Sequence, residues 1–234
     1  MLAAILRDAG LQYRRRPLAA VLTLALETAT LPLDDSGDAI QGVAGILLLV
    51  VAILVELFLV AYLADALSPT PAPARAAVAA ARRAVGPGVR GMLLLYLYVA
   101  VAFLIATLLF GGDQGTPLSS GEQRNFLIGA APLVAVAFAF LAVLSQRVVL
   151  DGERRALRAA AVSHRVAAAH FPICLIIGVL QAAGLTLGAF DPGGLVAVVV
   201  AVGLGLLDPV PVAMSNALFL RTRAQHATQP ERKV

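Results

Sequence analysis

The sequence contains little charge and a single cysteine. Only 14% of its 234 residues are charged, whereas soluble domains carry about 25%. Hydrophobic residues make up 60%, which is more apolar surface than a water-soluble fold of this size can bury. The lone cysteine, Cys174, excludes a disulfide bond within the chain. The composition therefore predicts a protein whose solvent is the lipid bilayer.

Catalytic and metal-binding motifs are missing as well. The sequence has no G-x-S-x-G, no H-E-x-x-H and no phosphate-binding P-loop. The three histidines, His164, His170 and His226, lie outside the long apolar segments, and none pairs with another type of metal ligand one helical turn away. We therefore expect no enzyme, no catalytic residue, no cofactor and no metal site.

One glycine-rich stretch, GPGVRG (Gly86–Gly91), matches the pattern G-x-G-x-x-G. A dinucleotide-binding fingerprint follows a strand within a βαβ unit. Here an alanine-rich helical pattern precedes the stretch and an apolar segment follows it. We interpret it as a helix stop and a flexible turn.

Six apolar segments have lengths near the roughly 20 residues that a membrane-crossing helix needs. None shows the alternation of a barrel strand, and in lipid every backbone polar group needs an internal partner. The sequence thus predicts an all-α fold, a polytopic membrane helical bundle of about six transmembrane helices over residues 17–220. The segments are Pro17–Leu33, Ala39–Leu63, Gly91–Phe110, Phe126–Val149, Phe171–Phe190 and Leu195–Leu220.

The two ends of the chain differ from this apolar domain. Over residues 1–16, apolar side chains recur at helical spacing, which predicts a short interfacial helix. Residues 221–234 are predicted to be a flexible cytoplasmic tail. A cleavable signal peptide is an alternative for the first apolar segment, but Glu27 inside it and the lack of a clean cleavage motif favour a retained helix.

Basic residues lie almost entirely on alternate connections between the apolar segments. Positive residues stay on the cytoplasmic side of a membrane, so both termini are predicted to be cytoplasmic in a multi-pass cell-membrane protein. Only Arg124 falls on the opposite side. The basic charge is then explained by the topology and by contact with anionic inner-leaflet lipid, rather than by binding of nucleic acid. The residues on the predicted cytoplasmic side are Arg7, Arg14, Arg15, Arg16, Arg75, Arg82, Arg83, Arg90, Arg147, Arg154, Arg155, Arg158, Arg165, Arg221, Arg223, Arg232 and Lys233.

Two of these basic connections resemble each other, at residues 64–91 and 150–172. Each starts with an Asp, continues as an alanine-rich helix with arginines, and stops at Gly/Pro or Phe-Pro. We interpret this as an internal duplication. In the second copy Arg154, Arg158 and Arg165 share one helical face, which favours contact with anionic lipid headgroups. The alternative is that they only set orientation and remain solvated.

The second connection also carries a family resemblance, in VVLDG (Val148–Gly152), SHRV (Ser163–Val166) and His170–Phe171. These residues resemble the polytopic membrane domain found with some glycerophosphodiester phosphodiesterases and in its stand-alone relatives. The resemblance covers about 25 residues and departs by a one-residue offset. It implies a polytopic helical fold and assigns no catalytic residue, because this chain has no soluble catalytic domain.

Small residues recur in the fifth segment as GLTLG, with Gly184 and Gly188 four residues apart. Such spacing lets two helix backbones approach closely. The pattern predicts helix packing within the bundle, or alternatively the seam of a homodimer or a contact with a partner membrane subunit.

Three acidic residues, Glu27, Glu56 and Asp208, lie within apolar segments. An ionised side chain in the bilayer core costs at least about 2.5–3.5 kcal/mol. No Arg or Lys lies deep in any segment to compensate them. Counting from the segment ends places Glu56 and Asp208 in the inner half, where they could share a site, and Glu27 nearer the outer half. The alternative is that each is a neutral carboxyl satisfied by its neighbours.

The last segment is interrupted at GLLDPVPVAMSN, Gly205–Asn216. Proline has no N–H, so Pro209 and Pro211 deprive the carbonyls of Gly205 and Leu207 of their helical donors. These freed carbonyls lie beside the Asp208 carboxyl. Some transporters hold Na⁺ or H⁺ with oxygen acceptors clustered in this way at a helix break. The candidate ion or proton site is therefore Asp208, Glu56, Gly205 and Leu207. Alternatives are a plain kink, or a segment that ends near Leu207 with residues 212–220 on the surface.

These observations lead to two functional hypotheses. The first is a non-enzymatic integral membrane protein that serves as an accessory or scaffold subunit. The second is a small secondary transporter or permease component that uses Asp208 and Glu56. They differ in whether the two acids face each other across a wet cavity or lie in sealed packing.

Overall fold

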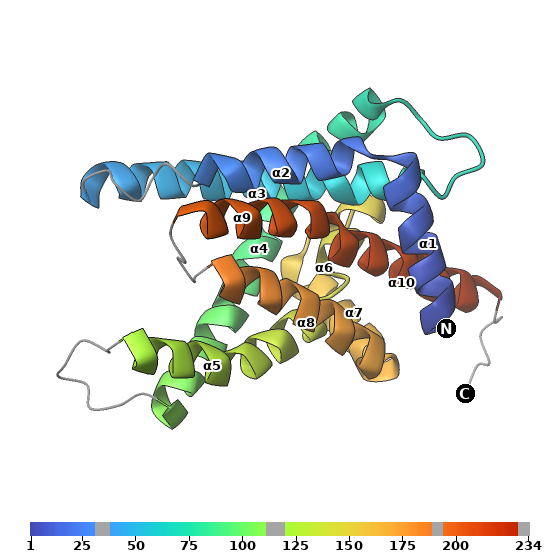
Figure 1. The fold of residues 1–234 in the computed structure, drawn as a ribbon. Coiled ribbons are helices and arrows are strands. Elements are labelled where there is room, and N and C mark those ends of the chain that lie inside the picture. Colours follow the sequence, from blue (N-terminus) through green and yellow to red (C-terminus); the bar gives the residue numbers. More distant parts are fainter. Residues whose placement is uncertain (31–37, 111–119, 189–193, 229–234) are drawn as a thin grey trace.

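The computed structural model describes residues 1–30, 38–110, 120–188 and 194–228. Within these ranges the chain is helical and contains no strand. The fold is therefore all-α, as the apolar segments predict (Figure 1). The helices are α1 (Leu2–Arg15), α2 (Leu18–Thr30), α3 (Asp38–Asp65), α4 (Ala74–Phe110), α5 (Ser120–Phe140), α6 (Leu144–Leu150), α7 (Ala156–Ala169), α8 (Phe171–Gly188), α9 (Gly194–Leu207) and α10 (Pro209–Thr228).

Several of these helices are suited to a membrane. Within the described ranges, three helical stretches are long and apolar enough to cross one: Ala74–Leu109, Ile128–Leu150 and Val202–Gln225. A fourth is reached if α7 and α8 count as one span, although they meet at a bend of 114°. Large apolar side chains on their outer faces, such as Leu108 and Leu109 of α4, are 72% and 65% exposed. Lipid is the solvent that such faces require.

Two predictions about helix boundaries are wrong. Residues Gly86–Gly91 do not stop a helix, because α4 runs through them with Pro87 inside it. The second glycine of the stretch, Gly88, allows close packing instead, since a Cβ there would lie 2.6 Å from a methyl group of Leu57 in α3. Similarly, α10 continues to Thr228, so the first eight residues of the predicted flexible tail are helical. The rest of the tail lies outside the described residues.

The two proposed copies of the repeated unit share a pattern but differ in geometry. In both, a helix ends beside an aspartate, at Asp65 and at Asp151, and an arginine-bearing helix follows. In the first copy this helix continues directly into the apolar part of α4. In the second, α7 ends at Ala169 and the chain turns by 114° into α8.

The helix α1 packs against α10 near the C-terminal end of the described chain (Figure 1). Its buried face is formed by Ile5, Ala9 and Gln12. The side chain of Gln12 donates to the carbonyl of Ala213 at 2.9 Å and accepts from the Asn216 amide at 3.2 Å. Asp8 accepts from Arg221 at 2.8 Å. The amphipathic pattern of residues 1–16 thus also serves contact with protein.

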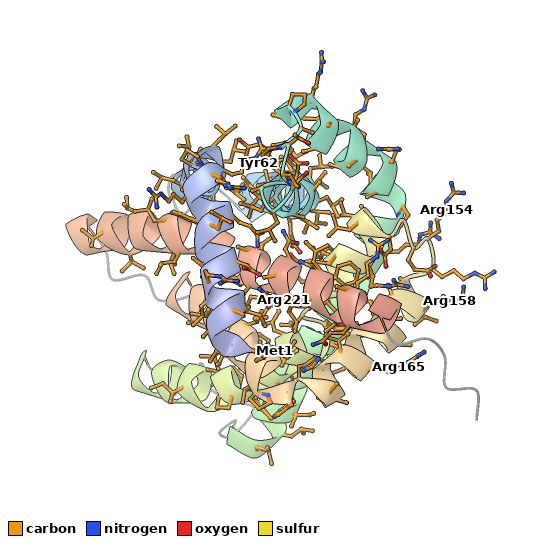
Figure 2. All side chains as sticks on the ribbon, turned by 90° about the vertical axis from the view of Figure 1, so that its right-hand side faces the viewer. Met1, Tyr62, Arg154, Arg158, Arg165 and Arg221 are labelled. Atoms are coloured by element: carbon orange, nitrogen blue, oxygen red, sulfur yellow. The ribbon has the colours of Figure 1, made fainter. Side chains whose placement is uncertain are left out.

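Ion pairs gather at one end of the bundle. Arg16 pairs with Asp65 at 2.5 Å, and Asp151 pairs with both Arg147 and Arg223. We call this the arginine end, and Figure 2 looks onto it. The N-terminus and the last turn of α10 lie at this same end (Figure 1).

The tightest helix contact of the described core joins α5 and α8. It forms at Gly178, where an added Cβ would lie 2.1 Å from the carbonyl oxygen of Ala135. Neighbouring side chains, Ile177 and Cys174 among them, are fully buried in the main apolar cluster. Hydrophobic side chains then pack on both sides of a direct backbone contact, which is how small residues join membrane helices.

We expect Gly178→Ala to destabilise the fold by about 1–3 kcal/mol, because the methyl group overlaps the backbone of α5. The matched control is Gly203→Ala on α9, where nothing lies within 4 Å of the added Cβ. The control should be neutral or stabilising by up to about 1 kcal/mol through higher helix propensity. Thermal unfolding in detergent measures both. Equal melting temperatures for the two variants would contradict the contact.

Candidate functional site

A cavity of about 150 Å³ lies where α2, α3 and α8 meet the junction of α9 and α10. Its polar lining residues are Thr23, Glu56, Gln181 and Asp208, and the rest of the lining is apolar. The structure thus brings together the two acids that the sequence placed in the inner half of the apolar segments. None of the described residues around this cavity is basic.

Asp208 occupies the break between α9 and α10. Its N–H donates to the carbonyl of Leu204 at 2.8 Å, so α9 closes its last turn before the two prolines interrupt the ladder. Beyond the break, residues 213–219 are all buried. This burial rules out the alternative in which residues 212–220 lie on the surface. The break is a kink within a packed helix pair.

The carbonyl of Gly205, which Pro209 deprives of a helical donor, has found a side-chain partner. The hydroxyl of Thr23 in α2 donates to it at 2.5 Å. Gly205 itself lies against α2, because a Cβ there would be 2.6 Å from the Cα of Leu24. Neither Gly205 nor Leu207 is among the residues that line the cavity. Of the four predicted site residues, the structure therefore gathers Glu56 and Asp208.

Glu56 accepts a hydrogen bond of 2.6 Å from the hydroxyl of Ser145 in α6. Beside it lies a second, much smaller chamber of about 20 Å³, whose polar lining is Glu56, Ser145, Gln146, Gln181 and Ser215. Such a volume holds about one water molecule. Within the described structure, the Oε1 atoms of Gln146 and Gln181 have no hydrogen-bond partner. Glu56 and Gln181 line both spaces, so the two chambers adjoin each other.

Gly184 of the fifth segment lies beside Asp208 rather than in a close contact between two helix backbones. A Cβ on Gly184 would meet only the Oδ1 atom of Asp208, at 3.9 Å. Gly184 therefore leaves room beside the carboxyl, while the close helix contact lies six residues earlier at Gly178. The surroundings of Gly188 and the side chain of Glu27 lie outside what the structure describes.

The three arginines predicted to contact lipid headgroups extend from one edge of the arginine end (Figure 2). Arg158 and Arg165 belong to α7, and Arg154 precedes it. All three are exposed, as is 76% of Leu157 between them. The opposite face of α7 is buried, through Ala159, Ala160 and Ala167.

Sequence reasoning missed Thr23, Ser145, Gln146 and Gln181 as parts of this site. Each is a polar residue inside an apolar segment, which is a usable signal because polar groups are costly in lipid. The sequence does not show which of them face one another. In the described part of the chain, no group of three or more His, Cys, Asp or Glu residues is placed to hold a metal ion.

The chain matches no protein-family model, no curated protein and no solved structure. The resemblance to the membrane domain found with glycerophosphodiester phosphodiesterases therefore stays a prediction.

We expect Thr23→Val to destabilise the fold by about 1–3 kcal/mol. Valine keeps the shape of threonine but leaves the Gly205 carbonyl without a donor in an apolar environment. The control is Thr107→Val, because the Thr107 hydroxyl only bonds the Phe103 carbonyl of its own helix from an exposed position. Thermal unfolding should separate the two variants, and an unchanged melting temperature for Thr23→Val would contradict the role of this bond.

Proposed function

We propose that the protein is a six-span integral membrane protein with both termini in the cytoplasm. Each of the six apolar segments corresponds to helical structure: α2, α3, the second half of α4, α5 with α6, α8, and α9 with α10. The N-terminus and the end of α10 lie at the arginine end (Figure 1), as an even number of spans requires. The positive-inside rule then assigns this end to the cytoplasm.

The orientation is tested by labelling single cysteines in a Cys174→Ala background. A cysteine at Ser119→Cys should react with a membrane-impermeant maleimide added outside intact cells, because residues 111–119 are assigned to the outer side. A cysteine at Arg155→Cys should react only after the membrane is permeabilised. The reversed labelling pattern would contradict the proposed orientation.

For the function itself, we propose cation binding within the membrane as part of a small secondary transporter. The observation that carries this proposal is the cavity of about 150 Å³ shared by Glu56 and Asp208. It contains two carboxyl groups from different helices and no basic residue among those described. Within a membrane, the charge of two carboxylates needs a bound cation or proton to balance it.

The remaining chemistry of the cavity fits a hard cation. Its polar groups are carboxyl, amide and hydroxyl oxygens, which are the ligands that alkali and alkaline-earth ions prefer. The volume is sufficient for an ion with a few waters, which supports the transporter hypothesis. A discontinuous helix beside the ion is a recurrent arrangement in secondary transporters.

An accessory or scaffold role, which the sequence also favours, makes a different demand on these residues. A scaffold requires that the helices pack and that the acids have hydrogen-bond partners, and it does not require a bound ion. The bond from Ser145 to Glu56 meets this demand for one acid. Asp208, an exposed residue at the break, donates its backbone N–H to the carbonyl of Leu204, but within the described chain its carboxyl accepts no hydrogen bond.

We expect Na⁺ or K⁺ to raise the melting temperature of the wild-type protein relative to choline at equal ionic strength. Saturating a site at about 100 times Kd stabilises by about 2.7 kcal/mol, which corresponds to several degrees. Asp208→Asn should fold but lose this response, since the amide keeps the shape and removes the charge.

The matched control for Asp208→Asn is Glu153→Gln, which makes the same carboxyl-to-amide change in the connection before α7. Its side-chain oxygen still accepts from the N–H of Arg155. The control should retain the full cation response. A wild-type melting temperature that ignores both the cation and the pH would contradict the transporter proposal and leave the scaffold as the function.

A further inference from the structure

A large double cavity opens at the arginine end, separate from the intramembrane site. Its two parts measure about 430 and 390 Å³ and share Ala80, Arg83, Val149 and Leu150 as a common wall. We call this space the vestibule. It lies between α3, α4, α6 and the end of α10, and each part falls in the size range of small-molecule sites.

The walls of the vestibule are held in place by polar contacts. The carboxylate of Asp65 accepts from Arg16 at 2.5 Å and from the N–H of Ala72 at 2.6 Å. Arg16 also donates to the carbonyl of Ala72 and lies 4.4 Å over the ring of Tyr62. These contacts fix the α3–α4 connection. The space exists because the facing residues of α4, Ala76, Ala77 and Ala80, are small.

The vestibule carries a net positive charge. Its two acids are already neutralised, Asp65 by Arg16, and Asp151 by Arg147 and Arg223. Within the described chain, Arg83 and Arg154 form no ion pair with an acid. Arg83 donates from its Nε to the carbonyl of Ala79, which leaves the other guanidinium nitrogens available. Two arginines thus have unused donors at the rim.

The rest of the lining is apolar. Val149 and Leu150 of α6 form the shared floor, and Leu220 of α10 closes one side. A ligand that fits this surface has an anionic group for the arginines and an apolar part for the floor. Arginine binds phosphate with paired, charge-assisted hydrogen bonds, which makes a phosphate ester the best-matched anion.

We propose that the vestibule binds the phosphate group of an anionic amphiphile, with Arg83 and Arg154 as the phosphate ligands. An anionic phospholipid of the adjacent leaflet supplies both the charge and the apolar part. A soluble phosphate ester supplies the charge alone. This site differs from the exposed row of Arg154, Arg158 and Arg165. It is a cavity in which Arg83 lies beside an apolar floor, and Arg158 and Arg165 do not line it.

The first test compares two neighbouring arginines in the purified full-length chain. Both arginines are exposed, but Arg83 lines both parts of the vestibule and Arg82 lines neither. Phosphatidylglycerol added to detergent-solubilised protein should raise the wild-type melting temperature more than phosphatidylcholine does. Arg83→Gln should weaken the apparent affinity about tenfold, the loss of one charge-assisted hydrogen-bond pair, while Arg82→Gln should leave it unchanged. Equal losses in both variants would overturn the proposal, since they indicate unspecific charge attraction.

The second test fills the space without changing any charge. Ala80→Leu places a larger side chain on the shared wall, and Ala79→Leu places the same side chain on an exposed position outside it. Phosphatidylglycerol should no longer stabilise Ala80→Leu but should still stabilise Ala79→Leu. Retention of the full lipid effect in Ala80→Leu would overturn the assignment to this cavity.

The source of the phosphate is decided by a third measurement with glycerol phosphate in place of lipid. Stabilisation by phosphatidylglycerol alone supports the amphiphile. Equal stabilisation by glycerol phosphate that depends on Arg83 assigns the site to soluble phosphate esters and overturns the lipid part of the proposal. These outcomes are independent of the Na⁺ response of Asp208, so failure of one site does not imply failure of the other.

Discussion

The arrangement of the apolar helices depends on one requirement, that a carbonyl group freed in an apolar environment must find another donor. Pro209 frees the carbonyl of Gly205, and the hydroxyl of Thr23 takes it up. This bond needs α2 and α9 to touch, which the missing side chain of Gly205 permits. With α2 held there, Thr23 becomes part of the cavity that Glu56 and Asp208 share. The proline break, the helix contact and the site are therefore consequences of the same constraint.

Charge is divided between two regions of the molecule. The cavity shared by Glu56 and Asp208 contains acids and no base among its described residues, whereas the vestibule has arginines in excess over acids. The helix α6 connects them, since Ser145 and Gln146 line the inner chamber and Val149 and Leu150 line the vestibule. Arg147 lies between these pairs on the helix and binds Asp151, which itself lines the vestibule. An acidic and a basic site thus lie along one short helix.

The helices could be predicted from the sequence because apolar length is a strong signal in lipid. The break at Asp208 was also predictable, since proline removes a donor whatever its surroundings. The continuation of α4 through Gly86–Gly91 could not be predicted in the same way. Gly88 packs directly on Leu57 of another helix, and local sequence does not show such a contact. Glu56 and Asp208 could be predicted as site residues because a carboxyl group within an apolar segment is energetically costly. Thr23 and Gln181 become partners only through the way in which α2 and α8 face α3.

The contact between α1 and α10 has a consequence for how the chain is made. Gln12 and Ala213 are 201 residues apart, and Asp8 and Arg221 are 213 apart. At ribosomal rates of about 5–20 residues per second, roughly 10–40 s pass between the synthesis of the first helix and that of its partner. During this interval the face of α1 formed by Ile5, Ala9 and Gln12 needs another partner, such as a lipid surface or a chaperone. Docking of α1 on α10 can therefore occur only after Arg221 has been translated, when both partners of these contacts exist.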